Sequence, residues 1–341
     1  MMIREHKECA KKRIKYLETF KVAPNWKSKL IIKVVRDDLK LVINRVTAWR
    51  ARRLAKILIE GSKEHQFGLL WSFAHETLRS NPGSTCIVTT HESKFQGIYL
   101  CLEACKRGFM SGCRQLLGLD GCFLKGNFGG QMLVAVALDA NDCIYPVAYA
   151  IVETENARSW RWFVSHLGED LRIVNSNEWT FMTGRQKGLQ KSKSHFSTKV
   201  KSDIVLNNLC EVFNNVVLED REKSVLTLLI DMNISCMKRI QSRRDKMRIA
   251  KGPLCPKIQK NLGKSMEIAE ECEVEWRWDL TGIPCGHGVA VILDRGDNPI
   301  KYVHECYTVQ TYLQCYKNIV NPINGKKLWS EVNTFPLQPP G

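Results

Sequence analysis

Three short apolar runs that follow one another directly are the feature that most restricts the fold of this chain. They cover residues 115–123, 131–140 and 144–153. Gly126, Gly129 and Gly130 lie in the first gap and Asn141-Asp142 in the second, which is typical of hairpin turns. We expect three consecutive antiparallel strands.

A helix and a further strand are expected after these runs. Trp160, Phe163, Val164, Leu167 and Leu171 recur at helical spacing, and Ser159 is placed to cap the helix. Residues 179–182 then form a short apolar run. The order β-β-β-α-β predicts an α/β protein whose core begins as a ribonuclease H-like fold does. Residues 96–110 do not decide between helix and strand.

The charge of the chain favours a polyanionic partner. Fifty-one Lys and Arg against 35 Asp and Glu leave a net charge of +16 over 341 residues. Nucleic acid is the first expectation and an acidic membrane surface the second. The charged start does not resemble a signal peptide, and no apolar run is long enough for a membrane span. The scattered cysteines are expected to be reduced thiols.

Residues 1–80 read as a basic helical region. Asn25-Trp26 opens one helical pattern, and a second begins at Asn44-Arg45-Val46 after a short break. Two helices joined by a turn are the outline of a helix-turn-helix. We expect the arginines of the second helix to face solvent and contact DNA, at Arg45, Arg50, Arg52 and Arg53. The alternative is a solvated basic helix in a small bundle.

A second basic stretch falls in residues 221–268, where a long helix is expected from 222 to 247. Its end carries the candidate DNA contacts Lys238, Arg239, Arg243 and Arg244. A charged solvent face that complements the helix dipole is an equally good interpretation. The proline-rich residues 336–341 are expected to be frayed.

Asp120 is the first candidate catalytic residue. It lies inside the first apolar run, where an acid is costly unless it is paired, protonated or holding a cation. In a ribonuclease H-like core, such an acid meets a second at the end of the strand after the helix. With a third from a later helix, they hold two Mg²⁺ that act on a phosphodiester. The alternative is that Asp120-Gly121 is a turn.

Several runs together resemble the plant Mutator-like element (MuDR family) transposases, in family order from about residue 19 to 332. The runs are residues 119–126 (LDGCFLKG), 129–131 (GGQ), 145–150 (YPVAYA), Asn156 with Ser159-Trp160, 185–189 (RQKGL), 207–214 (NNLCEVFN) and 278–287 (WDLTGIPCGH). The resemblance implies a DNA-binding N-terminal region (1–80) and a nuclease core with an Asp-Asp-Glu triad (81–220). It also implies a basic helical segment (221–268), a SWIM-type zinc finger (269–293) and a C-terminal extension (294–341).

The catalytic positions of this family are incomplete here. Asp120 matches the first acid and Glu211 best matches the third, but Gly184 stands where the second Asp precedes residues 185–189. The chain after 190 also lacks a large segment that the family carries. Without the second acid, Mg²⁺ affinity and in-line positioning should both collapse. The Mg-dependent cleavage and strand transfer of the family are therefore expected to be lost.

The zinc finger is incomplete too. Cys285 and His287 match the Cys-x-His pair of the family, whereas Glu273 and Glu275 occupy the places of its first two cysteines. Because structural zinc takes four N or S ligands, Cys272 would have to be a third ligand. A deletion between residues 276 and 277 explains the loss. We expect Cys285 and His287 to be remnants, with a zinc site as the alternative.

The favoured hypothesis is a nuclear, transposase-derived DNA-binding protein without activity, with homo-oligomerisation left open. One alternative is an active transposase in which Glu178, Asp170 or Glu169 replaces the lost acid. Another is a zinc-dependent interaction or transcription-factor module. A fourth is a decayed chain without a stable fold, because the deletions would expose apolar surface.

Overall fold

The computed structural model describes residues 26–126, 129–175, 179–183, 220–269, 281–332 and 334–340. The chain divides into two compact units, residues 1–69 and residues 70–341. Among the described residues, no helix has both the length and the apolar character that crossing a membrane requires.

The first unit contains the predicted pair of basic helices. These are α2 (Ser28–Leu39) and α3 (Arg45–Glu60), and a short α4 (Lys63–Gly68) follows them. The side chain of Asn44 accepts a hydrogen bond from the Thr47 amide at 2.8 Å and thereby caps α3. Ile31 of α2 packs with Ala48 and Ala55 of α3 in a small core. The helix pair and the start of its second helix are as predicted.

The second unit is built on a six-stranded sheet with the order β1-β2-β5-β4-β3-β6. Its strands are β1 (Thr85–His91), β2 (Lys94–Cys101), β3 (Leu116–Phe123), β4 (Gln131–Leu138), β5 (Ile144–Val152) and β6 (Thr180–Thr183). Neighbouring strands are antiparallel except β3 and β6, which are parallel. The predicted strands are confirmed, and β1 and β2 extend the sheet beyond β5.

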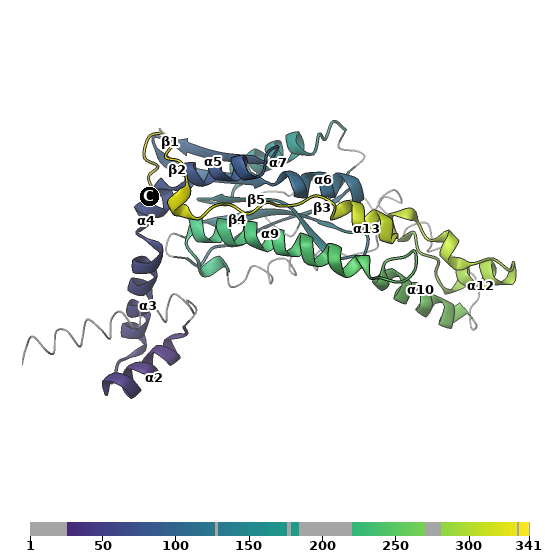
Figure 1. The fold of residues 1–341 in the computed structure, drawn as a ribbon, viewed down its shortest axis with the longest axis horizontal. Helices are drawn as coiled ribbons and strands as arrows, with labels where there is room; N and C mark the ends of the chain where they lie inside the picture. Colours follow the sequence, from purple (N-terminus) through teal and green to yellow (C-terminus); the bar gives the residue numbers. More distant parts are fainter. Residues whose placement is uncertain are drawn as a thin grey trace, which may run out of the picture. The chain divides into compact units, whose positions relative to one another are not determined.

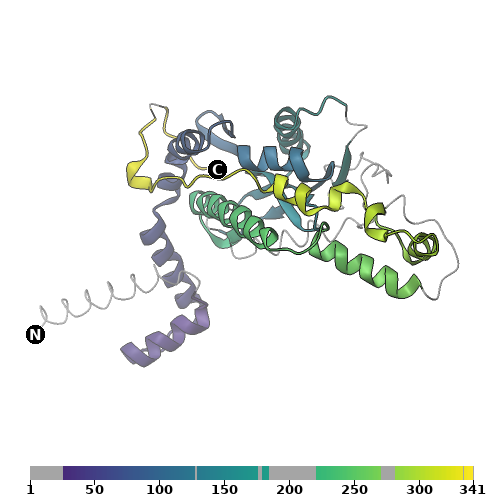
Figure 2. The same cartoon turned by 45° about the vertical axis from the view of Figure 1, so that its right-hand side comes forward.

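Helices cover both faces of this sheet, because every residue of β4 and β5 is buried. The helices of this unit are α5 (Leu70–Ser80), α6 (Glu103–Gly112), α7 (Ala157–Asp170), α9 (Val225–Arg248), α10 (Pro256–Ile268), α12 (Gly286–Asp294) and α13 (Val309–Cys315). Tyr99 contacts Phe163 of α7, whereas Tyr149 lies beside Cys236 of α9. Since Tyr99 pairs with Ala150, the neighbour of Tyr149, the two tyrosines point to opposite faces. Figures 1 and 2 accordingly show α7 and α9 on opposite sides of the sheet.

The structure corrects one local prediction and decides one region that the sequence left open. Asn156, not Ser159, is the N-cap of α7, and its side chain accepts from the amides of Arg158 and Ser159. Ser159 takes the third helical position, where its hydroxyl accepts from the Asn156 amide and closes a capping box. Residues 96–110, which the sequence left undecided, are divided between β2 and α6.

The C-terminal residues return to the body of the second unit. Asn321 and Asn324 bond to Asn81 and Glu76 of the α5 region, at 2.8 and 2.9 Å. The backbone of Gln338 exchanges hydrogen bonds with Ser93 and Phe95 at the tip of the β1–β2 hairpin. The expected fraying of residues 336–341 is therefore wrong for 336–340, because the hairpin tip satisfies their backbone.

Candidate functional site

Asp120 lies one strand in from the β6 edge of the sheet. It belongs to β3 and pairs with Val134 of β4, and its side chain is 9% exposed. Its Oδ1 accepts a hydrogen bond from the Gly121 amide at 2.9 Å. Val134 in turn pairs with Tyr149, so Asp120 shares the sheet face covered by α9. The alternative of an Asp120-Gly121 turn is excluded.

The end of β6 approaches Asp120 along the parallel pair. Thr183, the last described residue of this strand, pairs with Leu119, directly before Asp120. Gly184, where the second acid is missing, is the next residue in the chain and lies outside the described residues. Glu211, the expected third acid, also lies outside them.

Glu155 is an acid near this strand that the sequence analysis missed. Trp160 donates its indole N–H to Glu155 Oε1 at 3.0 Å. The Gln131 amide, in the orientation that satisfies both of its polar atoms, donates to Oε2 at 2.6 Å and accepts from the Glu155 amide at 3.2 Å. A Cβ on Gly121 would lie 2.8 Å from Oε2. The carboxylate therefore rests on the bare backbone of Gly121.

The surroundings of Glu155 raise its pKa. Burial is the main cause, the bond from Trp160 opposes it, and repulsion by Asp120 adds to it. No local sequence pattern identifies Glu155, since Gln131 and Gly121 are distant from it in the chain and become its neighbours only in the folded sheet. A Glu directly before the cap of a helix normally reads as a surface charge.

Asp120 and Glu155 approach the sheet from opposite faces. Successive side chains of a strand alternate between faces, so Gly121 and the Glu155 carboxylate lie on the α7 side, whereas Asp120 lies on the α9 side. Both oxygens of Glu155 are already occupied by donors from Trp160 and Gln131. Within the described part of the chain, no group of three or more His, Cys, Asp or Glu side chains gathers as a metal site. The described residues do not fit a pair of Mg²⁺ ions.

Of the three substitute acids considered from the sequence, the two that the structure describes, Asp170 and Glu169, do not join Asp120. Asp170 accepts from Thr85 Oγ1 at 2.6 Å, from the Tyr99 hydroxyl at 2.8 Å and from Lys106 Nζ at 3.0 Å. Its carboxylate thus ties α7 to β1, β2 and α6. Glu169 is 72% exposed and lies 3.6 Å from His166 Nδ1. Glu178 lies outside the described residues.

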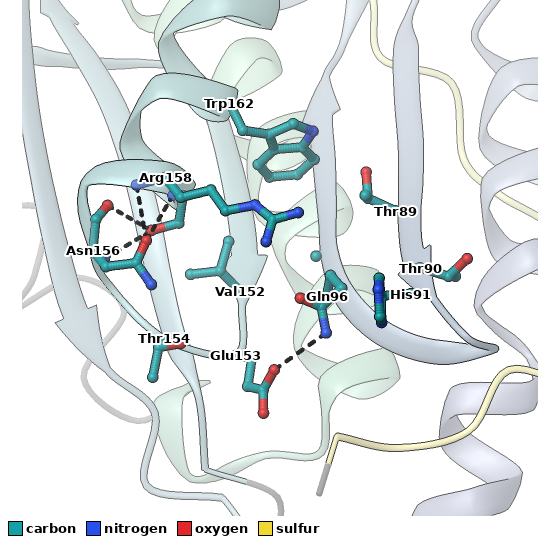
Figure 3. Close-up of a pocket in the computed structure, with 12 residues that line it drawn as sticks. Thr89, Thr90, His91, Gln96, Val152, Glu153, Thr154, Asn156, Arg158 and Trp162 are labelled. Atoms are coloured by element: carbon teal, nitrogen blue, oxygen red, sulfur yellow. Dashed lines mark hydrogen bonds between the residues drawn. The ribbon is translucent and has the colours of Figure 1, made fainter.

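A shallow pocket of about 160 Å³ lies elsewhere in the second unit, where β1, β2 and the end of β5 meet the start of α7. Trp162 forms one wall, and Figure 3 shows the Arg158 guanidinium beneath its ring. On the other side, Gln96 donates to Glu153 at 3.4 Å. Asp120 does not line this pocket, so the pocket and the candidate catalytic acid are separate features.

The expected DNA contacts of α3 face solvent with one exception. Arg45, Arg50 and Arg53 are exposed, and the Arg53 guanidinium lies 5.7 Å from the centre of the Trp49 ring. Arg52 is half-buried, so the expectation that it faces solvent is wrong. It lies on the side of the helix that carries the buried Ala48 and Ala55.

The basic end of α9 is only partly exposed, because some of its cations are used within the fold. Lys238 is exposed, but Arg239 Nη1 donates to the Ile144 carbonyl at 2.9 Å and holds α9 to the start of β5. Arg243 is half-buried beside Cys143, Tyr312 and Tyr316. Arg244 is also half-buried. Only part of this cluster is therefore available to a phosphate backbone.

The remnant zinc position contains two candidate ligands. Cys285 precedes the first residue of α12, and its Sγ lies 3.9 Å from Nδ1 of His287. Cys272, the expected third ligand, lies outside the described residues. Since structural zinc needs four ligands, the described residues do not fit a zinc ion.

One part of this chain matches the model of a protein family. Comparisons with curated proteins and with solved structures return no match. Residues 116–210 match the family model of the MULE transposase domain, which supports a relationship of this chain to the Mutator-like transposases.

Proposed function

We propose that this protein is a transposase-derived DNA-binding protein that has lost transposase activity. The match to the MULE transposase domain covers β3 to β6, the part of the sheet that carries Asp120. The net charge of +16 makes DNA the natural partner. We place the protein in the plant nucleus, where its DNA partner would be found.

The strand arrangement supports a ribonuclease H-like core within the sheet. Strands β3, β4 and β5 form an antiparallel meander, α7 crosses back, and β6 adds in parallel beside β3. This is the β-β-β-α-β order expected from the sequence. Asp120 on the first strand of this core, between β4 and β6, then occupies the position at which such a core carries its first catalytic acid.

The loss of activity rests on one observation at this strand pair. The register of β6 ends at Thr183 opposite Leu119, and the chain continues with Gly184 instead of an acid. The other described acid near β3, Glu155, lies on the opposite face and is held by Trp160. A two-metal reaction needs carboxylates that bridge both ions, and Gly184 has no side chain to supply the middle one.

An endonuclease assay tests the loss of activity. The full chain is incubated with supercoiled DNA and Mg²⁺ or Mn²⁺, and nicked product is followed over time. We expect no turnover above buffer and no change in Asp120→Ala. Turnover that Asp120→Ala abolishes would contradict the proposal. Gly184→Asp is the matched variant in which a gain is expected, because it returns an acid to the place of the second Asp. Its affinity for Mn²⁺, measured by calorimetry, should be higher than that of the native chain.

The DNA-binding part rests on the exposed arginines of α3. Arg45, Arg50 and Arg53 project from a helix whose opposite side is anchored by Ala48 and Ala55. Such a helix can approach the phosphates without exposing its core. Contacts of this kind release counterions, so affinity should fall steeply with added salt.

Salt titrations of DNA binding test this interface. Removing two phosphate contacts with Arg50→Ala/Arg53→Ala should weaken binding at every sequence and lower the slope of log K against log salt by about 2. Lys29→Ala/Lys33→Ala on α2 removes the same charge from exposed positions and is the control. Equal effects of both double variants, or a flat salt response of the native chain, would argue against α3 as the contact.

The SWIM-type remnant is a separate part of the proposal. We propose that Cys285 and His287 no longer hold a structural zinc ion, because Glu273 and Glu275 replace two of the ligands. Elemental analysis of reduced, zinc-replete protein decides this. About one zinc per chain would favour the zinc-module alternative instead.

A further inference from the structure

Two cysteines that are far apart in the sequence meet between α6 and α13. The Sγ atoms of Cys113 and Cys315 lie 3.3 Å apart, although the residues are 202 positions apart in the chain. Cys113 directly follows α6, and Cys315 is the last residue of α13. Both are free thiols.

Glycines bring the two helices together closely enough for this contact. A Cβ on Gly112 would lie 2.5 Å from the Thr311 carbonyl oxygen and 2.7 Å from Cys315 Cβ. A Cβ on Gly108 would overlap the carbonyl oxygen of Cys315. Since these helices touch backbone to backbone, the position of Cys113 relative to Cys315 is fixed by packing and not by flexible side chains.

The two thiols differ in access to solvent. Cys113 is half-buried, whereas Cys315 is 1% exposed. Burial raises the pKa of the Cys315 thiol, and the hydrogen bond with Cys113 adds to the effect. A small oxidant can therefore reach Cys113 first, and Cys315 is placed as the resolving partner.

We propose that Cys113 and Cys315 form a reversible disulfide by exchange with a low-molecular-weight disulfide such as oxidised glutathione. The Cys113 thiolate attacks one glutathione sulfur, and the other leaves as a thiolate. Cys315 then loses its proton and attacks the Cys113 sulfur, which releases the second glutathione. Two protein thiols are oxidised and one disulfide is reduced to two thiols, so no other oxidant is needed. Closing the bond moves the sulfurs together by about 1.3 Å.

The bond would fix the C-terminal part of the chain to the sheet. Tyr316, the residue after Cys315, donates its hydroxyl to the buried carboxylate of Asp139 at 2.8 Å. The disulfide would hold that contact in place and restrict the unfolded chain over a long loop. In a reducing compartment it would form only during oxidative episodes.

Peptide mapping of the full native chain tests this site directly. Reduced protein is exposed to oxidised glutathione, its remaining thiols are blocked, and it is digested with trypsin without reduction. The expected peptide Gly108–Arg114 contains Cys113 as its sole cysteine, whereas Tyr302–Lys317 contains Cys306 and Cys315. We expect these two peptides to be joined. The Tm should rise by a few degrees upon oxidation and return with dithiothreitol.

Cys315→Ser and Cys306→Ser are the matched pair of variants, because they change the two cysteines of the same peptide. The linked peptide should disappear in Cys315→Ser, which should stay glutathionylated at Cys113, and should persist in Cys306→Ser. Three results would overturn the proposal: Cys113 left free, Cys113 held as a stable glutathione adduct in the native chain, or Cys113 joined to a peptide other than Tyr302–Lys317.

Discussion

At the scale of single residues, Glu76 shows how a buried charge holds a distant segment. Its side chain is 3% exposed and accepts two hydrogen bonds at 2.8 Å from Arg79, one from Nε and one from Nη2. It also accepts from the Asn324 amide at 2.9 Å. The bonds from Arg79 are the main cause that lowers its pKa, burial opposes them, and the Asn324 amide adds to them. The charged carboxylate is thus favoured in the folded state.

This depressed pKa predicts a pH-dependent contribution to stability. It should be fully present above the unfolded pKa of about 4.3 and be lost as the pH falls through the lower folded value. Glu76→Gln should lower the free energy of unfolding, measured by urea denaturation at pH 7, by about 1–3 kcal/mol. The difference in this free energy between the variant and the native chain should be smaller at pH 3. The control is Glu169→Gln, at a side chain 72% exposed. A difference in unfolding free energy that is unchanged or larger at pH 3 would contradict this account.

The same scale shows what the sequence can reveal of the site. An acid inside an apolar run is visible in the sequence, and this identifies Asp120. The environments of Glu155 and Glu76 are not visible, because Gln131 and Asn324 reach them only in the folded chain. The burial of Arg52 is missed for a related reason, since helix periodicity alone does not show how closely α2 packs.

At the scale of elements, the contact between α6 and α13 depends on the absence of side chains. Gly108 faces the Cys315 carbonyl and the Tyr145 hydroxyl at distances that leave no room for a methyl group. Gly168 of α7 has no atom within 4 Å of the place where its Cβ would be. Both glycines lie inside helices, so intrinsic helix propensity would favour alanine at either place.

Replacing each glycine by alanine separates packing from propensity. We expect Gly168→Ala to be neutral or to stabilise the protein by up to about 1 kcal/mol. Gly108→Ala should destabilise by about 1–3 kcal/mol because backbone has to move. Urea denaturation of both variants measures the difference. A Gly108→Ala protein as stable as the native chain would show that α6 and α13 do not touch as described.

Elements that continuous apolar runs mark in the sequence were predicted well. The runs that became β3, β4 and β5 lie between turn residues, and these strands and α9 formed close to their expected limits. The start of α7 was misplaced because both Asn156 and Ser159 take part in its capping box. Residues 96–110 were ambiguous because a strand and a helix adjoin there with a single residue between them.

At the scale of the whole molecule, the second unit is completed by its end. Hydrogen bonds join Asn321, Asn324 and Gln338 to polar groups of the α5 region and of the β1–β2 hairpin. These partners precede them in the chain by more than 200 residues. Composition predicted fraying of residues 336–341, since a proline-rich segment carries no periodicity that indicates packing against the rest of the unit. The pairing of β1 and β2 with the side of β5 could not be predicted either, because an apolar strand pattern does not identify the neighbouring strand.

Removing this end should therefore destabilise the whole second unit. A chain that stops after Lys317 leaves the buried carboxylate of Glu76 and the buried side chain of Asn81 without the backbone amides of Asn324 and Asn321 as donors. We expect a Tm several degrees lower, measured by calorimetry. A chain lacking only residues 339–341 is the control and should melt as the native protein does. Equal melting of both truncated chains would show that residues 318–338 contribute nothing.

The hydrogen bonds made by residues 321–338 also have a consequence for the chain during its synthesis. Until residues 321–338 have been synthesised, Asn81 and Glu76 in the α5 region and the backbone of Ser93 and Phe95 lack hydrogen-bond partners that they have in the folded unit. A nascent chain in this state would be open to chaperones. Products truncated before residue 321 would stay in it and be cleared by proteases.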